Sequence, residues 1–190
     1  MSSVIKAIVF DCFGVLTSDT WQTFLDNLPP TADADKAREV HRAYNSGQIS
    51  KDECSKQIEL ATGRQFTEVE DQSSEIEKNQ ALLSYISELR QRHYKIGLLS
   101  NASSNWVREE FLTPDEQALF DDFVLSYEVG LVKPEARLFA VTAERLGVKP
   151  AEAVLVDDKK SFCEEAQKSG MKAVLYHDFK QCQQELEELL

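Results

Sequence analysis

Apolar residues lie along the chain in two patterns, short continuous runs and longer stretches with helical spacing. A short continuous run fits a strand that is covered on both faces, because such a strand has no solvent side to keep polar. Strands of this kind are predicted at residues 4–10, 95–99, 123–126, 153–157 and 172–176. From residue 79 onwards, amphipathic stretches fill the intervals, and this alternation predicts parallel strands joined by crossover helices.

The later helices are recognised by apolar positions three and four residues apart and by residues typical of helix ends. They are predicted at residues 79–92, 103–112, 115–120, 135–146, 161–169 and 178–190. Gly147 and Gly170 stand where a helix end needs a left-handed residue, and Ser161 with Glu164 has capping-box spacing. The expected fold class is therefore α/β, a three-layer Rossmann-like sandwich with a mainly parallel sheet.

The interval between the first two strands differs from the rest, because it shows helical patterns only. Its helices are predicted at residues 19–28, 33–45, 50–62 and from Thr67 onwards. This mostly polar insertion separates two parts of the alternating pattern. We expect residues 17–78 to form a helical cap domain over a crevice, and residues 1–16 and 79–190 to form the α/β core domain.

Polar residues follow four of the predicted strands. They are Asp11, the pair Ser100 and Asn101, Lys133 shortly after the third strand, and the pair Asp157 and Asp158. In an open parallel sheet, ligand sites form at the carboxyl ends of strands, so these residues are expected to converge in one crevice. This convergence favours an enzyme.

The charge balance limits the partners of the chain. With 190 residues and 42% apolar content, one ordinary core and a small insertion are expected. A formal charge of −12 argues against nucleic acid and against an anionic membrane. The same charge repels phosphorylated metabolites, so a site for them needs a local lysine or metal ion. The sequence leaves the oligomeric state open.

The location of the protein is predicted from what the sequence lacks. No apolar stretch approaches the roughly 20 residues of a membrane-spanning helix, and the first residues lack the order of a secretory signal. We therefore expect a cytoplasmic protein. The cysteines, which lack close paired spacing, predict reduced thiols rather than disulfides or a zinc site. They are Cys12, Cys54, Cys163 and Cys182.

The polar strand ends occur within residues 9–16, 98–101, 130–135 and 155–158. A carboxylate, then Ser-Asn, then Lys-Pro, then Asp-Asp, each after a strand, resembles the haloacid dehalogenase superfamily of hydrolases. Ala166 and Gly170 follow the last pair at a spacing typical of that group. The likeness extends over the chain apart from the cap, and the four motifs in this order are specific.

The resemblance implies a phosphatase and assigns roles to its residues. Asp11 is the expected nucleophile, which forms an aspartyl phosphate that water hydrolyses. Ser100 and Lys133 are expected to act in catalysis by holding the phosphoryl group, and Asn101 is a further candidate for substrate binding. Magnesium is the expected cofactor, because hard oxygen ligands suit it. Its expected ligands are Asp11, Asp157, Asp158 and the backbone carbonyl of Phe13.

Phe13 departs from the pattern of the resembled phosphatases, which carry a second Asp at this place. That Asp protonates the leaving group and then activates water, and such help is typically worth about 10² to 10⁴ in rate. The simplest expectation is a slow phosphatase or one restricted to good leaving groups. His41 and Glu53 of the cap are possible replacements, although His41 reads first as a surface side chain. Trp21 reads as core of the cap rather than as a ligand surface.

Two alternatives stay open beside the phosphatase. An aromatic residue at position 13 is reminiscent of 2-haloacid dehalogenases, whose halide leaving group needs no proton. Those enzymes use no magnesium and carry a cap arginine, for which Arg38 and Arg42 are weak nominees. The other alternative is a degenerate member that binds a ligand or a protein without turnover. The preferred function is a magnesium-dependent phosphomonoester hydrolase for a small phosphorylated metabolite, with Asp157 and Asp158 arguing against the dehalogenase.

Overall fold

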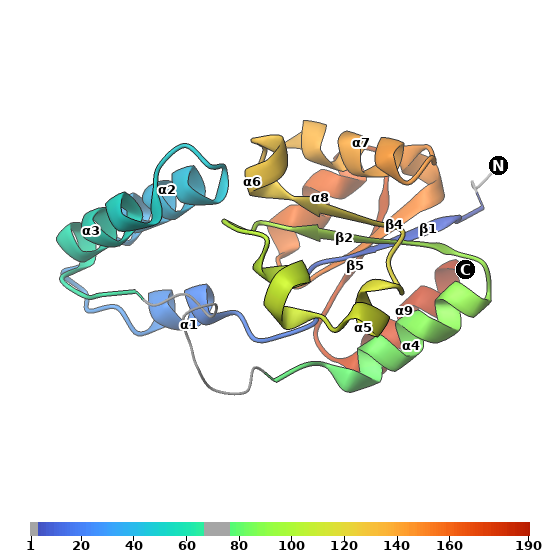
Figure 1. The fold of residues 1–190 in the computed structure, drawn as a ribbon. Coiled ribbons are helices and arrows are strands. Elements are labelled where there is room, and N and C mark those ends of the chain that lie inside the picture. The colour runs from blue at the N-terminus through green and yellow to red at the C-terminus, as the bar shows by residue number, and fades with distance from the viewer. Residues whose placement is uncertain (1–3, 67–76) are drawn as a thin grey trace.

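The computed structural model describes residues 4–66 and 77–190. The described residues contain one parallel sheet with strand order β3-β2-β1-β4-β5 (Figure 1). The strands are β1 (Ala7–Phe10), β2 (Lys95–Ser100), β3 (Asp122–Leu125), β4 (Ala153–Asp157) and β5 (Lys172–Leu175). Each predicted strand is present, with ends shifted by up to three residues.

Helices lie on both sides of this sheet. In chain order the helical elements are α1 (Thr20–Asp26), α2 (Ala34–Asn45), α3 (Lys51–Thr62), α4 (Gln80–Gln91), η2 (Val107–Phe111), α5 (Pro114–Gln117), α6 (Ser126–Val129), α7 (Ala136–Arg145), η3 (Pro150–Glu152), α8 (Lys160–Lys168) and α9 (Phe179–Leu189). Figure 1 shows α7 and α8 over one face and α4, α5 and α9 over the other. This arrangement confirms the predicted three-layer α/β fold.

Two apolar clusters hold the layers together. On one face, Leu82 and Ile86 of α4 and Leu186 of α9 pack with the side chains of Ile8 and Phe10. On the other face, residues of α7 and α8 pack against alternate positions of the same strands. Each fully buried Leu, Ile or Phe contributes roughly 1.5–3 kcal/mol. The strands therefore read as continuous apolar runs because both of their faces are covered.

The strand register aligns the carboxyl ends of the three central strands. Phe10, the last residue of β1, stands beside Leu98 of β2 and Val156 of β4. The next residue, Asp11, therefore lies level with Ser100 and Asp157 to within about one residue. The chain runs outward from β1 to β3 on one side and returns to β4 on the other. A crevice at this reversal of strand order is where open α/β sheets bind ligands.

Three local predictions are wrong. The segment 103–112 forms only a π-helical turn, η2, and the wider turn lets the rings of Trp106 and Phe111 stack with centroids 5.0 Å apart. Ser126, predicted as the last residue of the third strand, instead begins the short helix α6. The Ser161 capping box does not form, because α8 begins at Lys160 and no side chain caps it. Instead, the Lys159 N–H donates to Asp157 Oδ1 at 2.8 Å.

The helices α1, α2 and α3, here called the cap helices, stand beside the sheet rather than against it (Figure 1). They share a small core of their own that includes Val40, Tyr44 and Ile58. A buried hydrogen bond joins them to the rest of the chain, from Ser126 Oγ to the Asn45 carbonyl at 2.6 Å. That residues 17–78 form a separate domain stays a prediction, and the helix expected from Thr67 falls outside the described residues.

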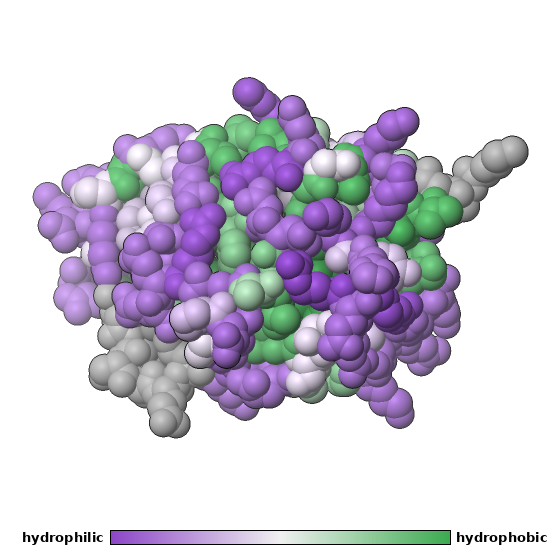
Figure 2. All heavy atoms as spheres, turned by 45° about the vertical axis from the view of Figure 1, so that its right-hand side comes forward, coloured by the Kyte–Doolittle hydropathy of each residue, from purple (hydrophilic) through white to green (hydrophobic). Residues whose placement is uncertain are grey.

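The surface and the cysteines complete the description. The face in Figure 2 is mostly hydrophilic, and Val4 and Leu60 are the large apolar side chains exposed among the described residues. Cys12, Cys54, Cys163 and Cys182 are buried, and none of them forms a disulfide. Burial raises the pKa of the Cys163 and Cys182 thiols to about 12, which makes them poor nucleophiles. Of the helices described, none has the length and apolar character needed to cross a bilayer.

One carboxylate ties the entry of β2 to the entry of β3. Asp121 Oδ2 accepts from the Ile96 N–H at 2.9 Å, and Oδ1 lies 3.0 Å from Lys95 Nζ. Burial opposes the charge, but the Ile96 N–H and the neighbouring cations outweigh it and lower the pKa of Asp121. We expect Asp121→Ala to cost about 1–2 kcal/mol of unfolding free energy at pH 7, measured by urea denaturation.

The lowered pKa of Asp121 also predicts that the stability difference between native protein and Asp121→Ala depends on pH. A carboxyl with a lowered folded pKa stabilises the protein above its ordinary value near 3.8, and this contribution is lost as the pH falls through the folded pKa. The difference between native protein and Asp121→Ala should therefore shrink below pH 4. Asp121→Asn, which keeps an acceptor for Ile96, should lose the pH-dependent part alone. A difference that is constant from pH 7 to pH 3 would contradict this.

Candidate active site

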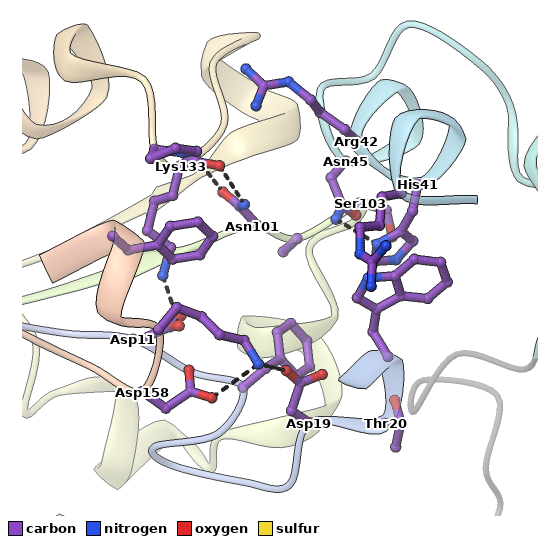
Figure 3. Close-up of a pocket in the computed structure, with 17 residues that line it drawn as sticks. Asp11, Asp19, Thr20, His41, Arg42, Asn45, Asn101, Ser103, Lys133 and Asp158 are labelled. Carbon is purple, nitrogen blue, oxygen red and sulfur yellow. Dashed lines mark hydrogen bonds and ion pairs between the residues drawn. The ribbon is translucent and has the colours of Figure 1, made fainter. Parts of the chain in front are cut away.

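The predicted site residues meet at the carboxyl ends of β1, β2 and β4. Asp11 directly follows β1, Asp157 ends β4, and Lys133 reaches in from the turn between α6 and α7. Together with Asp158 they border or underlie a cavity of about 320 Å³ (Figure 3). The strand register explains this meeting, because it brings three strand ends level before any loop is built.

Lys133 lies between two carboxylates. Its Nζ is 2.7 Å from Asp11 Oδ2 and 2.6 Å from Asp157 Oδ2, and its residue is 3% exposed. Burial disfavours the ammonium, but Asp11 and Asp157 outweigh it and raise the pKa of Lys133. Burial also raises the pKa of Asp11, against the opposing effect of Lys133. The two carboxylates beside Nζ favour the charged ammonium, so Lys133 forms an ion pair with each of them.

Three carboxylates form a candidate metal site. Oxygen atoms of Asp11, Asp157 and Asp158 lie within 4.8 Å of one another. Asp158 Oδ1 is buried and has no hydrogen-bond partner among the described residues. Burial raises the pKa of Asp158, and the Asp157 charge adds to that effect. Lys133 contacts Asp11 and Asp157, and Lys159 contacts Asp158 but is shared with Asp19. Acids still outnumber lysines here, so a divalent cation with oxygen ligands fits this donor set.

Gly14 makes room for this arrangement. Its backbone has φ +83°, and a Cβ placed on it would lie 2.5 Å from Asp158 Cγ. Any other residue would both strain the backbone and push the Asp158 carboxylate away. The loop after β1 is therefore shaped around the second acid of the pair.

Asn101 and Ser100 occupy different places at the end of β2. Asn101 lines the cavity, and its side chain holds the Lys133 backbone, accepting from the N–H at 2.8 Å and donating to the carbonyl at 3.2 Å. Asn101 thus positions the lysine loop. Ser100 is fully buried, and its Oγ has no partner within the described part of the chain. Direct binding of substrate by either residue stays a prediction.

Phe13 forms an apolar part of the cavity wall. Its ring stacks on that of Trp106, with centroids 6.0 Å apart and planes 13° from parallel. The position where a proton donor was expected in phosphatases therefore holds a ring fixed by packing. That the Phe13 carbonyl binds a metal ion stays a prediction.

Two charged residues of the cavity escaped prediction. Lys159 Nζ lies 2.8 Å from Asp19 Oδ2 and 3.2 Å from Asp158 Oδ2. The ammonium thus links the Asp-Asp pair to the start of α1, which Asp19 caps. Lys159 directly follows Asp158 in sequence, which is a signal that could have identified it. Asp19 adjoins none of the predicted site residues in sequence, so no comparable signal points to it.

The cap helices supply the opposite wall, and here one expectation is wrong. His41 is 9% exposed and lines the cavity instead of lying on the surface. Its ring stacks on Trp21 at 3.9 Å, so Trp21 both packs the cap helices and faces the cavity. Arg38 and Arg42 line the cavity as well. Glu53, the other possible donor, is exposed on α3.

The sheet order and this cluster define an α/β protein with a carboxylate-rich ligand site at a topological switch point. The family model of haloacid dehalogenase-like hydrolases matches residues 5–161. The chain therefore belongs to the haloacid dehalogenase-like hydrolase family.

Relatives and solved structures agree with this family. A D-ribitol-5-phosphate phosphatase from Bacteroides thetaiotaomicron is 30% identical over 176 residues, which cover 83% of this chain and 85% of the relative. A glyceraldehyde 3-phosphate phosphatase from Methanothermobacter thermautotrophicus is 34% identical over 48% of this chain and 41% of the relative. The structure of a predicted HAD-like hydrolase from Porphyromonas gingivalis has TM-score 0.66 and 25% identity, covering 90% of this chain and 91% of its own. The matches with the first curated relatives span less than half of those proteins.

The buried ion pairs predict a large effect of removing Lys133. We expect Lys133→Met to lower the free energy of unfolding by about 3–5 kcal/mol in protein free of divalent cations, because two buried carboxylates lose their cation. Lys168→Met is the matched control, since Lys168 pairs with Glu165 on the surface at 2.9 Å and its loss should leave the urea midpoint almost unchanged. Equal urea midpoints for the two variants would refute this central role of Lys133.

Proposed function

We propose that the protein is a magnesium-dependent phosphomonoester hydrolase for a small phosphorylated metabolite, acting through an aspartyl phosphate on Asp11. The observation that carries the proposal is the buried Asp11–Lys133–Asp157 cluster, next to an Asp158 oxygen that lacks a partner among the described residues. The relatives support it, because those named for glyceraldehyde 3-phosphate, D-ribitol 5-phosphate and phosphoserine share only the phosphate ester.

Asp11 has the attributes of a nucleophile. Its Oδ1 accepts from the Cys12 N–H at 2.7 Å, and its Oδ2 contacts Lys133, so the carboxylate is held in one orientation. An Asp11 oxygen forms a bond to phosphorus while the bond from phosphorus to the ester oxygen breaks. Water then attacks phosphorus, the bond to Asp11 breaks, and inorganic phosphate leaves. Lys133 provides a fixed positive charge beside the phosphoryl oxygens in both steps.

Magnesium fits the same residues. Asp11, Asp157 and Asp158 supply hard oxygen ligands, and the Phe13 carbonyl is the fourth candidate. When bound, magnesium supplies positive charge that offsets the repulsion between phosphate and carboxylates. Asp157 keeps its orientation through Lys133 and the Lys159 N–H, which hold its two oxygens. Asp158 is the acid whose position depends on Gly14.

Phe13 sets the limits of the reaction. It has no proton to give, so the departing alcohol takes its proton from solvent or from a neighbouring donor. Substrates with good leaving groups should react well, and simple alkyl phosphates slowly. The absence of an acid that protonates the leaving group lowers the rate, but the nucleophile Asp11 is still present.

A 2-haloacid dehalogenase is the second candidate, and the cavity contains a feature that favours it. Arg38 and Arg42 both line the cavity that Asp11 borders, and a carboxylate substrate would need such a cation. The Asp157–Asp158 pair weighs against it, because a halide needs no metal and gains nothing from adjacent acids. Release of halide from a 2-haloacid in EDTA would overturn the phosphatase in favour of this candidate.

The direct test uses an activated aryl phosphate. We expect turnover that requires magnesium and falls at least about 10³-fold in Asp11→Asn, because the amide cannot form the acyl phosphate. Release of the aryl alcohol and of phosphate is measured with and without EDTA. If Asp11→Asn retains native turnover, Asp11 is not the nucleophile. If native protein binds magnesium and phosphate without any turnover, the protein is a degenerate family member that binds a ligand without catalysis.

The second test restores the missing acid. We expect Phe13→Asp to raise kcat about 10²-fold or more for alkyl phosphates and much less for activated aryl phosphates, because only the former need protonation. Phe13→Asn is the matched control, since it also removes the ring from Trp106 but supplies no carboxyl group. An equal gain in both variants would show that space, rather than proton transfer, limits the reaction.

A further inference from the structure

Helix α2 presents a row of hydrogen-bond donors to the cavity. Arg38, His41, Arg42 and Asn45 all line it, and their spacing of three, four and seven residues puts them on one helix face. Figure 3 shows His41, Arg42 and Asn45 across the cavity from Asp11, Lys133 and Asp158. The cavity therefore has two polar ends, one at the sheet and one at α2.

The α2 end is positive, in contrast to the chain as a whole. The chain carries a net charge of −12, yet the two charged side chains of α2 that line the cavity are both arginines. Among the described residues, the acids that line the cavity are Asp11, Asp19 and Asp158. Each already lies within 3.2 Å of a lysine, Lys133 or Lys159.

The partners of the two arginines lie outside the cavity. Arg38 pairs with Asp35 at 2.9 Å, and the two side chains are 53% and 97% exposed. Arg42 pairs with Glu135 at 2.9 Å, again in an exposed position. Exposed pairs of this kind are weak, and each is one contact of a guanidinium with five N–H donors. Both arginines can therefore bind an anion inside the cavity.

Two neighbours hold this row in place. His41 stacks on Trp21, and Asn45 Nδ2 lies 3.4 Å from His41 Nδ1. The Asn45 carbonyl accepts from the buried Ser126 Oγ, which fixes the end of α2 to α6. The donors thus stand on a helix anchored at its carboxyl end, and a fixed helix is a better platform for recognition than a loop.

We infer that the α2 row is a second anion subsite, and that the substrate is a phosphate ester whose leaving group carries a carboxylate or a second phosphate. This inference rests on the proposed function. The phosphoryl group would sit between Asp11 and Lys133, and the second anion would bind Arg38 and Arg42. A cavity of about 320 Å³ suits a small metabolite with two charged ends.

The test compares matched substrates. Phosphate esters of ω-hydroxy acids with two to five carbons are each paired with the neutral alkyl phosphate and the α,ω-bisphosphate of equal length. We expect kcat/KM of the native enzyme to favour an anionic ester at least about tenfold at one or more lengths. The carboxylate and bisphosphate series then distinguish the two kinds of second anion.

Variants assign the preference to α2. In Arg38→Met and Arg42→Met, the ratio of kcat/KM for the anionic ester to that for the neutral ester should fall about tenfold or more. Lys36→Met is the control, because Lys36 lies on α2 but pairs with Glu39 away from the cavity. Glu135→Gln breaks the Arg42 pair without removing a cation, so it should keep the preference.

Two outcomes overturn the inference. Equal kcat/KM for anionic and neutral esters at every length would remove the subsite and leave the phosphatase standing. If kcat/KM for the anionic and the neutral esters falls equally in Arg38→Met and Arg42→Met, the arginines have a structural role only. If no ester reacts, Asp11→Asn protein with magnesium is titrated calorimetrically with carboxyalkylphosphonates and alkylphosphonates. A preference for the former that Arg38→Met abolishes supports the subsite even then, and equal affinities refute it.

Discussion

The site depends on the contact of one buried ammonium with two buried carboxylates. Lys133 sits between Asp11 and Asp157, which stand at the ends of adjacent central strands, and all three charged side chains are buried. Each charge is tolerated because the others are present, and removal of one exposes the rest to an uncompensated cost. The cluster carries a net negative charge even before Asp158 is counted. That excess fits a divalent cation at this site, and under the proposed function the cation would allow phosphate to bind.

The remaining cavity modifies this centre from the opposite side. Phe13 replaces a proton donor with a packed ring, while α2 adds positive charge at a distance from the reacting atoms. Lys159 joins the two sides, since it contacts both Asp158 and Asp19. Under the proposed function, chemistry and recognition belong to separate elements: the strand ends hold the reacting groups, and the cap helices select the leaving group.

Much of this arrangement was predictable from sequence, and the exceptions have physical causes. Strands buried on both faces leave uninterrupted apolar runs, and the polar residues that end them stand out, as Asp11 and Asp157 do. The π-helical turn before Phe111 was not predictable, because it depends on the stacking of Trp106 and Phe111. The helical period placed Arg38 and Arg42 on one face, but which face meets the cavity is decided by how α2 packs.

The claim that Asp11, Lys133 and a cation form one phosphoryl site is tested most directly by a crystal structure with magnesium and beryllium fluoride. We predict a trifluoroberyllate group bonded to an Asp11 carboxylate oxygen, within hydrogen-bond distance of Lys133 Nζ. Magnesium should lie among oxygens of Asp11, Asp157 and Asp158. Beryllium fluoride bound elsewhere, or an empty carboxylate cluster at saturating magnesium, would contradict it.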